Sequence, residues 1–341
     1  MIRVTALTSG QNVPPRRFRV QQFIRPLNQL GIEVSEHCLF MSKYASAPSP
    51  WLRPVWGAGK IFGRTPGLVA SQFADIVWLE REFLPGRFTL EGLTGSKRLF
   101  DVDDAIWLAG SPNFSEEIAS RCHGVIAGNQ FIADHYKKLG MHVWVVPTSV
   151  DTIRWNPAEN NRRDRWTIGW TGSKTNLEYL YLIERPLADF LVHHRDSRLL
   201  ILCDERPVFN KISDAHWQYE RWSPEKEIKV VQQMDVGLMP LPDTNWSRGK
   251  CSLKMLLYMS VGIPVIVSPV GHNREVLKWD EVGFAANDDH EWYQALSTLF
   301  KDTDLAVRLG NAGREVVREH YSVHKTAVDL ASIFRDVASS S

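Results

Sequence analysis

Short apolar runs of strand length alternate with helical patterns along the whole chain, and no other feature of the sequence constrains the fold as strongly. Apolar runs that predict strands lie at 3–7, 76–79, 99–102, 124–127 and 143–146, and then at 167–170, 199–202, 236–239 and 264–267. Amphipathic spacing predicts helices over 17–30, 130–139, 178–193, 225–234 and 305–320. Strands that alternate with helices form parallel sheets covered by helices, so we expect an α/β fold.

The chain is long enough for two domains, and its two halves begin alike. Its 341 residues are more than one small domain with a single hydrophobic core usually contains. IRVTALTSGQN near the start and WTIGWTGSKTN from Trp166 both combine a strand, a Thr/Ser/Gly turn and a helix start. The polar stretch NPAENNRRDR (156–165) between them predicts a linker. We therefore expect Rossmann-like, doubly wound domains at 1–160 and 161–322, and a helix over 323–341 that packs back across both.

Doubly wound sheets bind ligands at the carboxyl ends of their strands. Two such domains that face each other would bring these ends to a central cleft, where we expect the site. The net charge of +1 gives no general attraction to nucleic acid, so no nucleic-acid partner is expected. The four cysteines form no CxxC pair and the histidines no HxH or HExxH pattern, so we expect neither disulfides nor a metal site.

The N-terminus and one basic stretch bear on where the protein acts. A first strand at Ile2 and the lack of an apolar run of about 18 residues predict a cytoplasmic protein without a signal peptide. No acidic residue occurs between His37 and Ala74. That stretch carries a set of basic and aromatic residues: Arg53, Lys60, Arg64, Trp51 and Trp56. Such a surface predicts peripheral contact with an anionic membrane at its inner face, and a basic loop that binds the acceptor is the alternative.

Three cations, Arg248, Lys250 and Lys254, lie at the start of a helix predicted over 252–261. Gly262 would follow this helix as its cap, before the strand at 264–267. Cations are unfavourable beside a helix N-terminus, which already carries about half a positive charge. A diphosphate would satisfy the helix N–H groups and the side chains together. A solvated basic turn is the alternative.

The segment GKCSLKMLLYMSVGIPVIVSPVGHNREVL (249–277) resembles the donor-binding segment of family-4 retaining glycosyltransferases. Similar stretches are 99–107, 145–157, 168–180 and 234–251, and the loop TSGQNVPPRRFRVQQF is similar in character to the family's mobile glycine-containing loop. The resemblance implies the GT-B fold of two Rossmann-like domains. It also implies a nucleotide-diphosphate sugar as co-substrate, with no separate cofactor; the base, in UDP or GDP, stays open.

Carried over by position, the resemblance makes Lys254 and the N–H groups of Ser252 and Leu253 contacts of the diphosphate. The family's two carboxylates, eight positions apart, correspond to Gly249 and Leu257, neither of which can accept a hydrogen bond through its side chain. The other residues that we assign to the donor are Ser9, Gly10, Gly172, Ser173, Lys174, Arg221, Trp222, Arg248, Lys250, Cys251, Leu257, Gly271 and Glu275. Arg221 and Trp222 would stack against the base, although a packing role for Trp222 is equally open.

The acidic sequence FDVDDAIW (100–107) allows several interpretations. In the GT-B interpretation it ends a strand, and Asp103 or Asp104 orients the acceptor hydroxyl, with Asp101, Arg16 and Arg17 as further acceptor contacts. Asp101 and Asp103 also resemble a metal-binding DxD pair. They resemble the magnesium-dependent haloacid-dehalogenase phosphohydrolases as well, although Ala105 replaces the usual Thr. A structural role as a helix cap is the remaining alternative.

We therefore expect a metal-independent, retaining glycosyltransferase of carbohydrate or glycoconjugate biosynthesis. Its acceptor would be sugar-containing, lipid-linked or a small molecule. The residues expected to act in catalysis are Asp103, Asp104, Arg248 and Lys254. The cations and the helix N-terminus would stabilise the leaving diphosphate, while the acceptor hydroxyl enters on the same face. The alternatives are a phosphohydrolase at Asp101 and Asp103, or a nucleotide-sugar-binding protein without activity, for which Leu257 is the argument.

Overall fold

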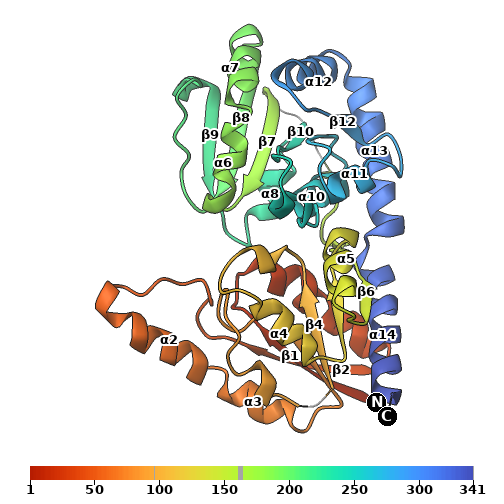
Figure 1. The fold of residues 1–341 in the computed structure, drawn as a ribbon. Helices are drawn as coiled ribbons and strands as arrows, with labels where there is room; N and C mark the ends of the chain where they lie inside the picture. The colour runs from red at the N-terminus through yellow and green to blue at the C-terminus, as the bar shows by residue number, and fades with distance from the viewer. Residues whose placement is uncertain (96, 160–163, 341) are drawn as a thin grey trace. The chain divides into compact units, whose positions relative to one another are not determined.

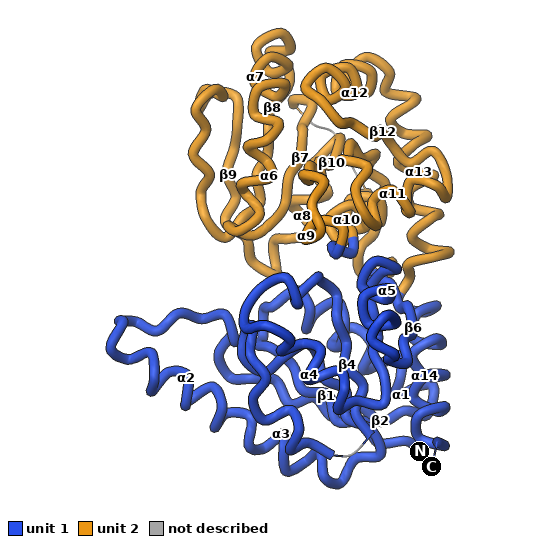
Figure 2. Tube along the Cα trace, in the orientation of Figure 1, with its two compact units in different colours: residues 1–149, 249–251, 323–341 blue, residues 150–248, 252–322 orange. Residues whose placement is uncertain are grey.

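The computed structural model describes residues 1–95, 97–159 and 164–340. The chain forms two compact units: 1–149 with 249–251 and 323–341, and 150–248 with 252–322 (Figure 2). The domain boundary that we predicted at 160–161, and part of the linker 156–165, lie outside the described residues. The three residues Gly249–Cys251 belong to the first unit, although both of their chain neighbours belong to the second.

The first unit contains a six-stranded parallel sheet in the order β2-β1-β3-β4-β5-β6. Its strands are β1 (Ile2–Thr8), β2 (Ile32–Cys38), β3 (Ile76–Glu80), β4 (Arg98–Val102), β5 (Gly124–Ala127) and β6 (Val143–Val145). The five predicted strands are confirmed. The edge strand β2 was not predicted, because its first residues alternate between buried and exposed and form no continuous apolar run.

Helices cover both faces of this sheet (Figure 1). The helices of this unit are α1 (Ile24–Gln29), α2 (Arg53–Phe62), α3 (Thr65–Ser71), α4 (Phe114–Ser120), α5 (Gln130–Lys138) and α14 (Val323–Ser339). The C-terminal helix α14 packs on one face, where Phe334 meets Trp78 at 5.2 Å between ring centroids. Side chains of α4 and α5 pack on the other face, against Val77 and Leu79.

The predicted helix over 17–30 is interrupted. It consists of a π-helical turn at Arg16–Val20, a 3-10 turn at Gln21–Phe23 and then α1. Pro26 within α1 has no backbone N–H to donate, which prevents a regular α-helical hydrogen bond at this point.

The second unit repeats the design with the parallel order β12-β11-β10-β7-β8-β9. Its strands are β7 (Trp166–Gly172), β8 (Ser197–Cys203), β9 (Trp217–Arg221), β10 (Val236–Met239), β11 (Val265–Val267) and β12 (Gly283–Ala285). Its helices are α6 (Leu177–Tyr181), α7 (Glu184–His193), α8 (Glu227–Val231), α9 (Asn245–Arg248), α10 (Leu253–Ser260), α11 (His272–Val276), α12 (Asp289–Lys301) and α13 (Thr303–His320). The predicted helix over 178–193 is divided into α6 and α7, with Pro186 in the first turn of α7.

No helix in the described part of the chain combines the length and the apolar character needed to cross a membrane.

A buried hydrogen bond joins α10 to the central strand β7, because the N–H of Thr171 donates to the hydroxyl of Tyr258 at 2.8 Å. We expect Tyr258→Phe to lower the free energy of unfolding by about 1–3 kcal/mol, since it leaves a buried N–H without a partner. Tyr181→Phe is the matched control, because its hydroxyl accepts the N–H of Val208 in an exposed position. Urea unfolding measures both, and equal losses would contradict a special role for the buried bond.

Candidate active site

The predicted donor residues of the second unit lie mainly where three neighbouring strands end. Gly172 ends β7, Arg248 lies in the connection after β10, and Gly271 follows β11. These strands are adjacent in the order β11-β10-β7, and the carboxyl ends of parallel strands meet at one edge of the sheet. The second unit therefore brings these three loops together, as a ligand site at this edge requires.

The N-terminus of α10 is built to leave its first turn without a side-chain cap. The helix begins at Leu253, one residue later than predicted, because Ser252 has a left-handed backbone with φ of 56°. The hydroxyl of Ser252 donates to Asn273 Oδ1 at 2.7 Å, and it accepts no hydrogen bond from an N–H of the helix. The partial positive charge of the first-turn N–H groups therefore stays at this end, where it favours an anion.

Lys254 lies in the first turn of α10, over the indole of Trp170 in β7. The ammonium nitrogen is 4.6 Å from the ring centroid, which is the geometry of a cation–π contact. The side chain of Lys254 is half-buried. The contact holds its charge at the edge of the sheet where β7 ends.

Gly271 and Arg248 pack backbone against backbone. Gly271 has φ of 53°, and a Cβ there would lie 2.7 Å from the Cα of Arg248, so only glycine fits. The guanidinium of Arg248 is exposed and donates to both carboxylate oxygens of Asp243, at 2.7 and 3.1 Å. Any anion that binds Arg248 must therefore compete with Asp243 for it.

The other predicted donor residues of the second unit make contacts of their own. Lys174 pairs with Glu205 at 2.6 Å, and its backbone N–H donates to Asp204. The remaining residues are placed as follows: Ser173 accepts from Asn176, Trp222 donates to Glu227, Glu275 pairs with Lys278, and Arg221 is exposed at the end of β9. Arg221 and Trp222 lie at the end of β9, two strands away from β7, so they are the least closely grouped of the set.

Leu257 is a core residue. Its side chain is only 2% exposed, on the buried face of α10. A side chain in this position does not border open space, so the predicted contact with the nucleotide is wrong for Leu257. The resemblance could indicate the position along the helix, but only the packing of α10 decides which of its faces is accessible.

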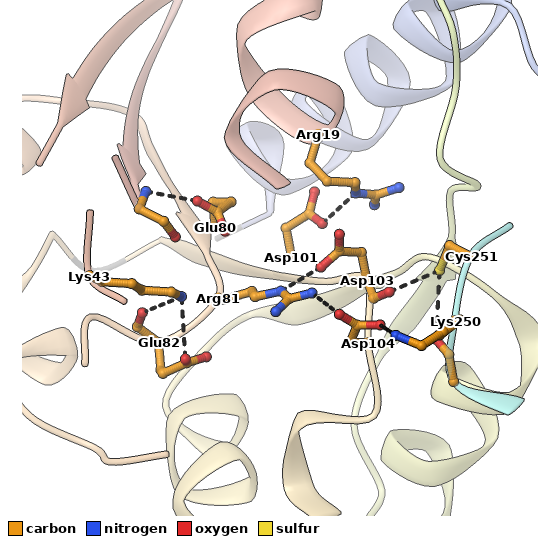
Figure 3. A network of polar contacts seen from close by, with 12 residues as sticks. Arg19, Lys43, Glu80, Arg81, Glu82, Asp101, Asp103, Asp104, Lys250 and Cys251 are labelled. Carbon is orange, nitrogen blue, oxygen red and sulfur yellow. Dashed lines mark hydrogen bonds and ion pairs between the residues drawn. The ribbon is translucent and has the colours of Figure 1, made fainter. Parts of the chain in front are cut away.

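In the first unit, charged side chains gather where β3 and β4 end (Figure 3). Arg81 lies at their centre and has a left-handed backbone, with φ of 56°. Its Nε donates to Asp103 Oδ1 at 2.5 Å, its Nη2 donates to Asp104, and its Nη1 donates to Tyr44 at 3.2 Å. Left-handed backbone costs a non-glycine residue about 1–3 kcal/mol, and it persists only where surrounding contacts impose it. Arg81 therefore holds both predicted catalytic carboxylates in place.

The electrostatics of this group follow from burial and pairing. Burial lowers the pKa of Arg81, but the negative groups around it, with Asp103 first, outweigh burial and raise this pKa well above its ordinary value. Burial raises the pKa of Asp104, but Lys250 and Arg81 outweigh it and the net pKa is lowered. Arg81 and Asp104 thus stay charged at neutral pH. Arg81 was not predicted as a site residue, although three charged residues, Glu80 to Glu82, directly follow the apolar run 76–79. Ligand sites lie at the carboxyl ends of such strands, so this was a usable signal.

Lys250 and Cys251 lie in the first unit, beside these carboxylates. Lys250 Nζ is 3.9 Å from Asp104 Oδ1, and Cys251 Sγ donates to the carbonyl of Asp103 at 3.2 Å. The side-chain amide of Asn129 donates to the carbonyls of Gly249 and Lys250, at 3.0 and 3.1 Å. We predicted Lys250 and Cys251 as donor contacts. Within the first unit they lie beside Asp104 and Asp103, and the donor assignment stays a prediction.

Asp101 is part of the core and not of an accessible site. It is 1% exposed, and it accepts hydrogen bonds from Arg19 Nε at 2.8 Å and Trp78 Nε1 at 3.0 Å. Burial raises the pKa of this carboxyl, against the attraction of Arg19. Asp101 is therefore wrong as an acceptor contact. The metal and phosphohydrolase interpretations lose their support as well, because both need Asp101 and Asp103 to reach one ligand.

The N-terminal loop after β1 is held by packing and by acidic partners. The N–H of Ser9 donates to Glu80 Oε2 at 2.8 Å, and a Cβ at Gly10 would lie 2.7 Å from the Cα of Ser42. Arg16 donates to both oxygens of Glu36, at 2.6 and 2.9 Å. Arg17 lies 5.0 Å from the ring of Phe18. Ser9 and Gly10 therefore lie at the carboxyl end of the first sheet, in the same unit as Lys250 and Cys251, whereas the other predicted donor residues belong to the second unit. Among the described residues, no group of three or more His, Cys, Asp or Glu side chains is arranged to hold a metal ion.

Arg81→Gln should lower the free energy of unfolding by about 3–5 kcal/mol at neutral pH, because it leaves two largely buried carboxylates without their cation. Since the pKa of Asp104 is lowered by folding, its stabilisation is present above the usual pKa of about 4 and is lost as pH falls through the folded-state value. The difference from the wild type should therefore shrink below about pH 4.

The control is Arg318→Gln, which removes an exposed pair with Glu315 and should cost less than about 1 kcal/mol. Urea unfolding at neutral and acidic pH measures both variants. A loss at Arg81 that is as small as the control, or that does not change with pH, would contradict the role that we give to Arg81.

Comparison with known proteins agrees with this architecture. Residues 167–302 match a family model described as Glycosyl transferases group 1. The structure is similar to that of sucrose-phosphate synthase from Thermosynechococcus elongatus, with 12% identity, a TM-score of 0.71 and 100% coverage of both chains. HepE from Anabaena, in complex with UDP and glucose, has 10% identity and a TM-score of 0.68, over 98% of this chain and 100% of that one.

A third similar structure is WaaG, a glycosyltransferase involved in lipopolysaccharide biosynthesis, with 11% identity and a TM-score of 0.65, over 97% of this chain and 99% of that one. No curated protein matches the sequence. The structural likenesses show the fold, and the family model spans the second unit from β7 to α12. The chain thus has the GT-B fold of two Rossmann-like domains, and the comparisons support a glycosyltransferase.

Proposed function

We propose that this protein is a retaining glycosyltransferase of the family-4 type, which transfers a sugar from a nucleotide-diphosphate sugar to an acceptor hydroxyl. The observation that carries this proposal is the start of α10. There an uncapped first turn and the ammonium of Lys254 lie together, within the segment that matches group 1 glycosyltransferases. Both features favour the same ligand, a diphosphate.

The donor end of the reaction is an electrostatic task. As the bond between the anomeric carbon and the leaving phosphate oxygen breaks, negative charge develops on the diphosphate. The first-turn N–H groups of α10, together with Lys254 and Arg248, stabilise this charge without a metal ion. When the donor binds, Arg248 leaves its exposed ion pair with Asp243 and binds the phosphate.

The acceptor end is the group of carboxylates that Arg81 holds. Asp103 and Asp104 are more exposed than Asp101, with side-chain exposures of 15% and 22%, and they orient the acceptor hydroxyl. The hydroxyl oxygen forms the new bond to the anomeric carbon on the face that the diphosphate leaves, and its proton passes to a phosphate oxygen. This route conserves the anomeric configuration and needs no side-chain nucleophile.

Uridine nucleotides are the first donors to test. The similar HepE structures contain UDP, UDP with glucose, and UDP-glucose. The acceptor on this proposal is a sugar-containing, lipid-linked or small molecule. A nucleotide-sugar-binding protein without activity is the other possibility, and an assay for transfer separates the two.

The diphosphate assignment is tested best with Lys254→Met, which removes the charge and keeps an apolar chain over Trp170. We expect it to weaken UDP binding about ten- to a hundredfold, because a charge-assisted contact is lost. Arg308→Met is the control, since Arg308 is exposed and pairs with Glu281 in the same unit. Titration calorimetry measures the affinities, and melting temperatures check folding. Unchanged affinity in a folded Lys254→Met variant would remove the donor-site assignment.

Independence from metal is a separate prediction. Transfer from a UDP-sugar should be unchanged by excess EDTA, because cations and helix N–H groups carry the leaving-group charge. Proton NMR of the product should show the anomeric configuration of the donor. Activity that EDTA abolishes and Mg²⁺ or Mn²⁺ restores would contradict the metal-independent mechanism, and inversion at the anomeric carbon would contradict retention.

A further inference from the structure

The outer side of α2 and of the turn before it is apolar and exposed. Trp51, Val55, Ala58 and Phe62 recur at intervals of four, three and four residues, the spacing of one helix face. Trp51 is 77% exposed, Val55 is 68% exposed and Phe62 is 74% exposed. We call these four residues the α2 surface. Exposed apolar side chains continue after it, at Val69 in α3.

The opposite side of α2 is attached to its own unit by polar contacts. Lys60 Nζ donates to the carbonyls of Lys43 and Ala45, at 2.7 Å each, and Trp56 Nε1 donates to the carbonyl of Ala45 at 3.2 Å. Figure 1 shows α2 at the margin of the first unit, away from the sheet. An ordinary surface helix buries its apolar stripe and exposes its polar one. In α2 this order is reversed, so packing within the unit does not explain the α2 surface.

The charges around the α2 surface have one sign. No Asp or Glu occurs between His37 and Ala74. Arg53 is exposed at the start of α2, and within the described residues neither Arg53 nor Lys60 pairs with a carboxylate. We expected Lys60 and Arg64 to lie at the surface, but both are buried, at 8% and 3% exposure. Arg53 is thus the exposed charge of this stretch, and most of the contact area is apolar.

We propose that the α2 surface binds an anionic lipid membrane, with Trp51, Val55 and Phe62 at the boundary between headgroups and acyl chains. A helix with an aromatic and aliphatic face, basic residues and no acidic ones is suited to this boundary. Tryptophan has an apolar ring and a polar N–H, which suits the membrane interface, where acyl chains lie on one side and water on the other. Arg53 lies beside the apolar face, where it can meet lipid phosphate.

Two other occupants fit less well. A twofold pairing of this surface with a second copy would bring two stretches of like charge together, with no acidic residue in either stretch to pair with Arg53. An acidic peptide would find one exposed cation on a mainly apolar face. An anionic bilayer satisfies the apolar area and the charge together, because its headgroups and its acyl chains lie at adjacent depths.

Flotation of the full chain with lipid vesicles tests this proposal. One set of vesicles contains phosphatidylcholine alone, and the other contains phosphatidylcholine mixed with phosphatidylglycerol. We expect binding to both, with tighter binding to the anionic vesicles. The double variant Val55→Ser/Phe62→Ser should bind at least tenfold more weakly, because it loses two buried apolar contacts. Arg53→Gln should remove the preference for anionic vesicles.

The matched control is Val192→Ser/Val208→Ser, which changes two residues of the second unit with comparable exposures of 60% and 74%. It should bind vesicles like the wild type. All substituted residues are exposed, so the melting temperatures should not change, and UDP affinity is measured separately so that the donor-site proposal is tested independently. Equal flotation of the double variant and the wild type would overturn the proposal, as would the absence of wild-type binding. A dimer in light scattering that the double variant abolishes, without any vesicle binding, would instead make this face a contact between copies.

Discussion

The arrangement of the first unit's site depends on the ion pairs that the buried guanidinium of Arg81 makes with Asp103 and Asp104. A carboxylate that is removed from water is costly unless a cation and hydrogen bonds compensate for it. Arg81 compensates for two of them, Asp103 and Asp104, from a strained left-handed backbone at the end of β3. The ion pairs and the backbone strain are linked, because the direction of the Arg81 side chain depends on its left-handed backbone conformation. Asp104 also pairs with Lys250, which extends the group to the segment 249–251.

The site of the second unit has the opposite charge to the carboxylate group of the first unit. Its site has an excess of positive charge, from the N-terminus of α10 and from Lys254, and no side-chain cap neutralises the helix. Ser252 is of a residue type that is strongly preferred as a helix N-cap, but its hydroxyl donates to Asn273. A helix N-terminus without a side-chain cap favours an anion. The two units thus offer complementary chemistry, with carboxylates for a hydroxyl in one and a cationic helix end for a diphosphate in the other.

The candidate site could be predicted in part, because its charged residues lie near the ends of strands, and the strands can be recognised in the sequence as apolar runs. The cations before α10 and the acids after β4 were both recognisable in this way. Two assignments, those of Asp101 and Leu257, were wrong because burial is not a local property. Asp101 precedes Asp103 by two residues, yet it faces Arg19 in the core. Leu257 lies on the buried face of α10.

The sequence by itself determined the two parallel sheets, most of their strands and the position of the donor segment, since hydrophobic periodicity and turn residues act within short stretches of chain. Only the tertiary structure decided the edge strand β2, the partners of Arg81 and the reversed orientation of α2. Each of these depends on contacts between residues far apart in the chain, such as Lys60 with the carbonyl of Lys43. Residue order does not specify which face of an element meets water, because that choice is made by whatever else packs there.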